Sequence, residues 1–499
     1  MSRHKSGREN LQLVFPLIAA LFLIIGFILG SFFAPQGRIK TLYPENSSAI
    51  STLNEALGFL SSKYVDPLDK DSLAEEAISF WMSNLDPFST YIKPNDLAWM
   101  NERLSGSYVG IGIEFMIKND SILVVSVLEN GPASKAGMQI GDILIAAGST
   151  ILDKTGKSNP ENIIKNVRGK EGTSVKVKIY RPSSKKIISL ECIRKGLDMP
   201  SVGPFLNYNK SIGYIRIKEF SATTDQEFML AMDSLFGRKE KRKDLILDLR
   251  GNPGGYLEKA THMLNQLIPE SGKIMVSTKS KSGKETVYKS SGRPFFTTGN
   301  IVVLMDENAA SASEIVAGAL QDHKRATIIG RRSFGKGLVQ AQYKLSNGGA
   351  LKLTIAKFYT PSGKLIQNPY QKGDTSTVRR GIFPDVLIPL AALDTMELWE
   401  NAKRLTIPFV IKNKPDGFIT YDPSKGKMAT VNWAAFLPDH KLVTAYLMEF
   451  NLDDEFRLSA WKRLKVAYAK QYLSSEAAIS IEFEVDPFLK EALRSLEVK

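Results

Sequence analysis

The sequence predicts a layered α/β protein with an inserted β-rich module, a helical region before that module and a single transmembrane helix at the N-terminus. Three observations support this fold class. An uncharged apolar run extends from residue 11 to residue 34. Short β-rich segments separated by Gly, Pro and Asn follow between residues 110 and 193. From Ile212 onward, strand patterns alternate with helical patterns, as in a layered α/β core.

The apolar run Leu11–Ala34 is long enough to cross a bilayer, since about 20 helical residues span a hydrocarbon core of about 30 Å. Three basic residues precede it, so the positive-inside rule keeps residues 1–10 in the cytoplasm. We expect a single-pass anchor in the inner membrane, with the rest of the chain in the periplasm. A cleaved signal peptide is the alternative, although Phe32 suits its cleavage motif poorly.

The composition excludes several kinds of site. The chain has 499 residues, enough for about three domains, and its 43% apolar content is ordinary for a globular protein. Its single cysteine, Cys192, excludes an internal disulfide and any CxxC site. A net charge of +14 comes from dispersed basic residues, which indicates a solvated surface and no nucleic-acid partner. We predict neither a cofactor nor a metal.

Four segments follow the anchor. Residues 45–104 have helical periodicity that the Asp86-Pro87 turn interrupts, and residues 105–195 form the β-rich module with one helix at Glu161–Val167. Residues 196–390 form the α/β core, with strands IGYIRI, LILDL, IVVLM and ATIIG and helices near 225–236, from about 256 and near 311–320. Residues 391–499 have no assigned role, although residues 453–472 are amphipathic.

The β-rich module begins with a glycine-rich turn that enters a strand. Such a turn can direct several backbone N–H groups into one concavity that binds a carboxylate, and the strand edge can then pair with an extended peptide. Further on, a GPAxxAG pattern from Gly131 precedes Gly141-Asp142-Ile143-Leu144. Together these patterns resemble a PDZ domain over residues 105–195. The resemblance implies binding of a free apolar C-terminus by a carboxylate loop of Gly110, Ile111, Gly112 and Ile113.

Two loops of the core carry candidate chemistry. Ser311 follows the strand IVVLM and precedes a helix, so its hydroxyl is exposed next to N–H groups that favour a developing negative charge. Lys336 lies between two glycines after the strand ATIIG. A serine nucleophile needs a base, and a buried lysine serves if its pKa falls from about 10.4 toward 7–8.

Each candidate has an alternative interpretation. His262 or His323 would complete a Ser-His-Asp triad, but nothing in the pattern places either beside Ser311. Ser311 would be a simple N-cap, with Glu314 completing a capping box. The segment from residue 330 to 337 nearly matches a phosphate-binding loop, but Gly337 replaces the hydroxyl residue that holds magnesium.

The motifs, taken in order, resemble the carboxyl-terminal processing peptidases, also called tail-specific proteases, over roughly residues 57–386. The matching segments are LDPFSTY from Leu85, the PDZ-like module, LDLRGNPGG from Leu247, SASE from Ser311, AGALQD from Ala317, SFGKG from Ser333, YTPSGK from Tyr359 and GIFPD from Gly381. This family cleaves proteins near their C-terminus with a serine–lysine dyad on a core similar to that of the crotonase superfamily.

The resemblance assigns roles to individual residues. It implies Ser311 as the nucleophile, Lys336 as the general base and Gln340 as the residue that orients the lysine amine. It also implies an oxyanion hole formed by Gly254, Gly255 and Ala312. Asp322 matches an acidic family position, and we interpret it as structural.

Two positions depart from the family pattern. Phe88 stands where the family often has histidine, in a motif that we expect to lie remote from the chemistry, and Ala309 stands where a serine is common. The prediction is therefore a serine endopeptidase that cleaves extracytoplasmic proteins near an apolar C-terminus held by the PDZ domain. An inactive PDZ scaffold that tethers periplasmic partners and a small-ester hydrolase are the alternatives. A homo-oligomer or an adaptor protein remains open.

Overall fold

The structure, a computed structural model, describes residues 48–118, 121–152, 160–237, 243–370, 378–389, 406–413, 419–422, 427–431, 437, 440–450, 452–473 and 475–497. The chain divides into two compact units, Met1–Ile78 and Ser79–Lys499. The first contains helix α2 (Ser48–Lys63) and the beginning of α3 (Lys70–Ser83), in the region predicted to be helical. The predicted anchor at residues 11–34 lies outside the described residues, and no described helix has both the length and the hydropathy of a membrane span.

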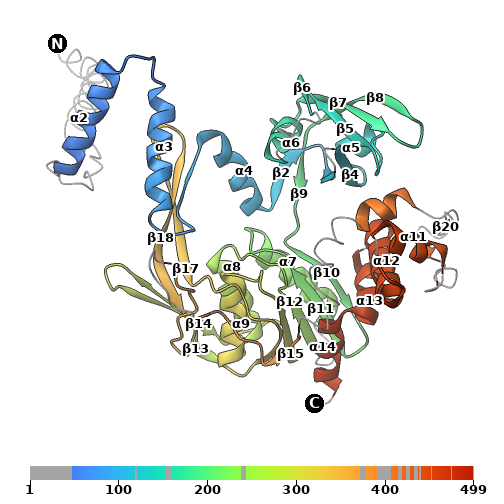
Figure 1. The fold of residues 1–499 in the computed structure, drawn as a ribbon. Helices are drawn as coiled ribbons and strands as arrows, with labels where there is room; N and C mark the ends of the chain where they lie inside the picture. The colour runs from blue at the N-terminus through green and yellow to red at the C-terminus, as the bar shows by residue number, and fades with distance from the viewer. Residues whose placement is uncertain are drawn as a thin grey trace, which may run out of the picture. The chain divides into compact units, whose positions relative to one another are not determined.

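The core of the second unit is a six-stranded sheet of order β10-β11-β12-β15-β16-β19. Strands β11 to β19 in this order are parallel, and β10 is antiparallel to β11. The predicted alternation of strands and helices is present (Figure 1). The elements are β10 (Val202–Asn207), β11 (Ile212–Ile217), α7 (Thr224–Phe236), β12 (Lys243–Asp248), α8 (Leu257–Leu267), β15 (Thr298–Met305), α9 (Ala312–Asp322), β16 (Ala326–Gly330) and β19 (Val386–Leu387).

Side chains of the parallel strands alternate between two apolar layers. Leu245 and Val303 pack with helices α7, α8 and α9 on one face. Ile246 and Leu304 pack on the other face with helices α13 (Ser475–Val485) and α14 (Pro487–Glu497). Parallel strands that are covered on both faces need an apolar residue at nearly every position, which explains the continuous runs in the sequence. Part of the C-terminal segment, whose role the sequence left open, therefore covers the core sheet.

A second, antiparallel sheet was not predicted. Its order is β1-β18-β13-β14, with β17 paired to β18. Its strands are β1 (Thr90–Ile92), β13 (Ser271–Ser280), β14 (Glu285–Ser291), β17 (Leu338–Lys344) and β18 (Ala350–Tyr359). Strand β1 belongs to the segment that we predicted to be helical, and helix α4 (Pro94–Ser105) follows it. The turn at Asp86-Pro87 interrupts the helical pattern, and the aromatic and β-branched residues after it form a strand of this second sheet.

The β-rich module folds as one sheet of order β3-β4-β5-β7-β8, with β6 paired to β5. Its apolar core includes Cys192, whose thiol is fully buried. A two-stranded pair, β2 with β9, begins and ends the module. The elements are β2 (Ser107–Gly110), β3 (Ile113–Lys118), β4 (Ser121–Val127), α5 (Pro132–Lys135), β5 (Ile143–Ala147), β6 (Thr150–Ile151), α6 (Pro160–Val167), β7 (Ser174–Arg181), β8 (Lys186–Ile193) and β9 (Lys195–Asp198).

The rest of the described C-terminal segment has its own apolar cluster. Helices α11 (Lys441–Glu449) and α12 (Arg457–Tyr472) pack around the buried rings of Tyr446 and Tyr468. Helix α12 and the 3-10 turn Asp454–Phe456 before it fall within the predicted amphipathic segment. A short hairpin of β20 (Ile419–Asp422) and β21 (Lys427–Val431) completes the described elements.

Candidate active site

Ser311 lies at the sharp turn between strand β15 and helix α9. Its backbone has φ +57° and ψ −113°, a conformation that non-glycine residues rarely adopt. An ordinary N-cap residue is extended instead. The turn therefore holds Ser311 in a strained geometry at a helix N-terminus, as a nucleophile on a strand-to-helix elbow requires.

The loop after β12 packs directly against this turn. Gly254 has φ +97°, and a Cβ at this position would lie 2.7 Å from Ser311 Cβ and 2.7 Å from the Ala310 oxygen. The Ala310 N–H donates to the Asn252 oxygen at 2.9 Å, and Ser313 Oγ donates to the same oxygen at 3.0 Å. A glycine is required at residue 254 because the two loops approach more closely than a side chain permits.

Gly254 and Ala312, two of the three residues predicted for the oxyanion hole, meet beside Ser311. A Cβ on Gly254 would lie 2.9 Å from the Ala312 nitrogen, and Gly255 is bridged to Phe220. The Gly254 N–H donates to Asn252 Oδ1 at 2.8 Å, so it would have to leave this acceptor to bind an oxyanion. The assignment of Gly254, Gly255 and Ala312 as donors stays a prediction.

Lys336 lies in the loop between β16 and β17, and its side chain is half-buried. Its Nζ donates to Gln340 Oε1 at 3.1 Å. Burial and, to a smaller extent, the positive charge of Lys352 lower the pKa of Lys336 to about 8, against the opposing effects of Glu314 and Asp86. Gln340 therefore contacts the amine as predicted, and this amine titrates in the range that a general base needs.

Glu314 joins the Ser311 turn to the Lys336 loop. Its fully buried Oε2 accepts from the Ser311 N–H at 2.7 Å and from the Lys336 N–H at 2.9 Å. Its Oε1 accepts from Ser333 Oγ at 2.5 Å and from the Gly335 N–H at 2.7 Å. Burial raises the pKa of Glu314, while these four donors oppose the rise. The same carboxylate thus caps helix α9 and holds the lysine loop, so the capping interpretation and the catalytic one are compatible.

This role of Glu314 was not predicted, because the sequence pattern indicates the residue only as a capping partner of Ser311. Local spacing cannot show that a loop about twenty residues later folds back onto the same carboxylate. A charged residue within a helix of otherwise small and apolar residues, at Ala312–Leu320, was the available signal, because a buried charge requires partners.

The expectation that the Phe88 motif lies remote from the chemistry is wrong. The Lys336 Nζ lies 4.8 Å from the centroid of the Phe88 ring, and the Phe88 oxygen accepts from Gln340 Nε2 at 2.5 Å. The physical reason is sheet pairing: β1 pairs with the same strand β18 that pairs with β17, and β17 carries Gln340.

The two candidate histidines are engaged by other groups. His262 Nδ1 lies 3.1 Å from Asp225 Oδ2, and His323 Nε2 lies 2.7 Å from the Ile274 oxygen. Neither contact brings an imidazole to Ser311. Asp322 accepts from the Ser362 N–H at 2.9 Å and so fixes the turn at residues 360–364, which agrees with its structural interpretation.

The predicted carboxylate loop lies between β2 and β3. Gly110 ends β2, Gly112 has φ +76°, and Ile113 begins β3. The buried Ile111 oxygen accepts from the Ala133 N–H at 2.9 Å, which joins the loop to the start of α5. Strand β3 is at the end of its sheet and pairs, among the described strands, with β4. One edge of β3 therefore lies next to the loop, where an extended peptide would add; peptide binding stays a prediction.

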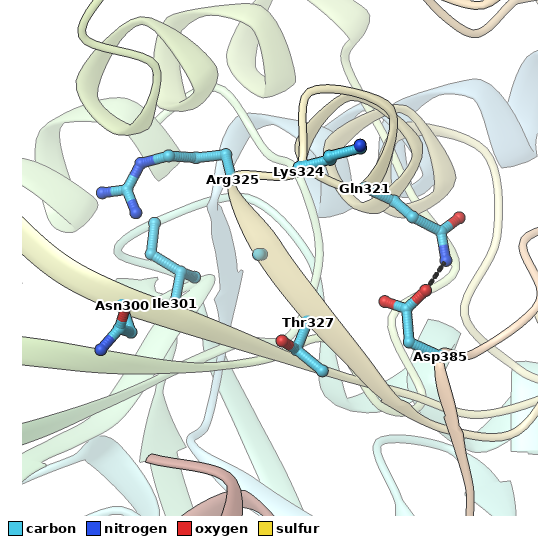
Figure 2. Close-up of a pocket in the computed structure, with 8 residues that line it drawn as sticks. Asn300, Ile301, Gln321, Lys324, Arg325, Thr327 and Asp385 are labelled. Carbon is cyan, nitrogen blue, oxygen red and sulfur yellow. Dashed lines mark hydrogen bonds between the residues drawn. The ribbon is translucent and has the colours of Figure 1, made fainter. Parts of the chain in front are cut away.

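A pocket elsewhere in the core lies at the end of the parallel sheet where its strands begin. Its lining includes Ile301 near the start of β15 and Thr327 near the start of β16. Figure 2 shows Gln321 donating to Asp385 across it, at 2.8 Å. Ser311 and Lys336 instead follow the carboxyl ends of β15 and β16. Because parallel strands end at a common edge, this pocket is separate from the serine–lysine loops.

Comparisons with known proteins identify two parts of the chain. Residues 211–388 match the model of peptidase family S41, and residues 109–192 match the PDZ domain. A probable CtpA-like serine protease of Staphylococcus aureus (strain COL) is 32% identical over 397 residues, covering 78% of this chain and 74% of the relative. Carboxy-terminal processing protease CtpB of Bacillus subtilis (strain 168) is 32% identical over 339 residues, covering 67% of this chain and 68% of the relative. The solved photosystem II D1 C-terminal processing protease is 25% identical, with a TM-score of 0.40, and the match covers 70% of this chain and 94% of that one.

Proposed function

The chain belongs to peptidase family S41 as a C-terminal processing serine peptidase with a PDZ domain, and from this premise we propose that Ser311 and Lys336 form its catalytic dyad. Membership in a peptidase family disfavours the inactive scaffold and the small-ester hydrolase. One observation carries the dyad assignment: a single buried oxygen, Glu314 Oε2, accepts from the backbone of both residues. The nucleophile and the base are therefore held on one rigid group.

The chemistry follows from the protonation state of the lysine. An uncharged Lys336 amine takes the proton of the Ser311 hydroxyl as its oxygen attacks the scissile carbonyl carbon. The N–H groups of the Gly254–Gly255 turn and of Ala312 stabilise the oxyanion, and the peptide bond then breaks as the lysine ammonium gives its proton to the leaving amine. A water molecule, deprotonated by the same amine, then attacks the carbonyl carbon of the acyl-enzyme, and the bond to Ser311 Oγ breaks as the lysine ammonium returns its proton to that oxygen.

We propose a protein substrate whose apolar C-terminus binds the loop from Gly110 to Ile113 and extends along strand β3. Main-chain pairing at a strand edge supplies affinity for any extended tail, and the apolar end residues supply selectivity. We also propose that residues 11–34 anchor the enzyme in the inner membrane and that its substrates are periplasmic. Extraction of membranes with alkaline carbonate tests the anchor, because an anchored chain stays in the pellet and a peripheral one is released.

The dyad is tested by the variants Ser311→Ala and Lys336→Ala with an unfolded protein that ends in apolar residues. Each change removes a member of one catalytic unit, so we expect cleavage to fall about a thousandfold or more, and the double variant to be no worse than either single one. Lys364→Ala is the matched control, since its side chain is 71% exposed on the turn held by Asp322. Full cleavage by either dyad variant would contradict the assignment.

A further inference from the structure

Phe88 contacts the predicted general base in two ways. The Lys336 Nζ lies 4.8 Å from the centroid of its ring, within the range of a cation–π interaction. The Phe334 ring meets the Phe88 ring edge to face, with centroids 6.3 Å apart, and so packs against the ring that lies beside the amine. A ring in this position has two opposite effects on the pKa of the amine. Its face attracts an ammonium ion, which raises the pKa, and its bulk keeps water away, which lowers the pKa.

The backbone of Phe88 orients the other contact of the amine. The Phe88 oxygen accepts from Gln340 Nε2, which turns Gln340 Oε1 toward the Lys336 amine. A flipped amide would instead point its NH₂ group at the amine and lose both hydrogen bonds. The hydrogen bond from Nζ to Oε1 fixes the rotation of the amine, and this rotation decides where the lone pair of the neutral form points.

The position of Phe88 is itself set by the core. Asp86 Oδ1 accepts from the Phe88 N–H and from the Ser89 N–H, each at 2.8 Å, and β1 then pairs with β18. The charged groups that act on the Lys336 amine come from three other places: Lys352 on β18, Glu314 on α9 and Asp86 before β1. The Phe88 ring is therefore an uncharged neighbour of the amine, beside the three charged groups that shift its pKa.

We propose that Phe88 is a positioning residue for Lys336: its ring holds the amine and keeps water from it, and its carbonyl fixes the orientation of Gln340. This inference rests on the proposed function, because it concerns the general base named there. The segment before the PDZ domain thereby contributes to the chemistry of the core.

Two substitutions separate the two effects of the ring. Phe88→Ala admits water to the amine, so we expect the acid limb of the kcat/KM profile to move up by at least about half a pH unit, with a lower kcat and little change in KM. Phe88→Leu keeps an apolar cover and removes the ring face, so we expect the limb to move down by about half a pH unit. Phe295→Ala and Phe295→Leu, at a ring that is 75% exposed, are the matched controls and leave the limb in place.

Opposite shifts at one position distinguish this role from a general disturbance of the fold, which would move both variants alike. The inference is overturned if the acid limbs of Phe88→Ala and Phe88→Leu both stay at the wild-type pH, or if both move in the same direction. If Phe88→Ala does not fold in a thermal melt, the sign of the Phe88→Leu shift decides. If Ser311→Ala and Lys336→Ala are inactive but neither Phe88 variant moves the acid limb, this inference alone is wrong. If the dyad variants keep their activity, the proposed function is wrong.

Discussion

In the proposed mechanism, Lys336 accepts a proton from Ser311 only in its uncharged form, so the surroundings of the amine decide the pH at which the enzyme works. An exposed lysine amine has a pKa near 10.4 and is almost entirely charged at neutral pH. Burial lowers the pKa of Lys336 to about 8, which leaves roughly a tenth of the amine uncharged at pH 7. Glu314 and Asp86 oppose this shift, so the pKa reflects a balance between lost hydration and two carboxylates.

The pH dependence of cleavage follows from this balance. Below about pH 8 the ammonium form dominates, so we expect kcat/KM to fall about tenfold for each pH unit of acidification, and to level off above about pH 8. The measurement is kcat/KM between pH 6 and pH 10 with one peptide substrate, with circular dichroism at each pH as the control for folding. A profile that is flat across this range, or one that is still rising tenfold per pH unit at pH 10, would contradict the role of Lys336.

At the scale of elements, the site depends on the approach of the loop after β12 to the N-terminus of α9. The sequence predicted both loops, since each lies between a strand and a helix. Their contact requires glycine at residue 254, where a Cβ would crowd Ser311. Gly283, in the turn between β13 and β14, has a comparable φ of +78°, and a Cβ added there would meet no atom within 4 Å. The two positions therefore share backbone strain and differ in crowding.

This difference gives a direct comparison. We expect Gly254→Ala to reduce kcat at least tenfold, because the added methyl group separates the loop from Ser311 and Ala312. Gly283→Ala carries the same strain, about 1 kcal/mol, and we expect normal cleavage with a small loss of stability. Steady-state kinetics and urea unfolding measure the two effects. Equal kinetic losses in both variants would show that strain, and not proximity to Ser311, is responsible.

At the scale of the whole molecule, the C-terminal helices are part of the catalytic core. Helices α13 and α14 cover the face of the parallel sheet opposite α8 and α9. Arg250, in the motif after β12, donates to Asp248 Oδ2 at 2.7 Å and to Asp486 Oδ2 at 2.6 Å. The Phe488 ring lies 4.9 Å from the same guanidinium. The motif that carries Gly254 is thus fixed to the C-terminal helices by a partly buried ion pair.

The energetic role of this cover is measurable. Leu489 on α14 is fully buried against the sheet, so we expect Leu489→Ala to lower the free energy of unfolding by about 2–5 kcal/mol. We expect KM to stay unchanged well below the melting temperature, since the substitution is on the sheet face away from α9. Leu458→Ala on α12, at a side chain that is 52% exposed, is the control and loses little stability. Similar losses from both substitutions would show that α14 does not stabilise the core.

The sequence by itself determined the local features of this protein. Strands β11, β12, β15 and β16, helices α7 to α9 and the PDZ domain follow from periodicity, turn residues and motif order, because each depends on residues close together in the chain. Ser311 and Lys336 were candidates from the sequence because each lies in a short motif beside a predicted strand, whereas Gln340 was implied by the family resemblance.

The tertiary structure alone decided the surroundings of the dyad. Phe88 reaches Gln340 across 252 residues through the shared strand β18, and the sequence gives no periodic signal for such pairing. Glu314 links the backbones of Ser311 and Lys336, and residues after 474 cover one face of the parallel sheet. Both contacts also join segments that are distant in the sequence. Contacts between distant segments depend on which faces are buried together, and that depends on the packing of the whole core.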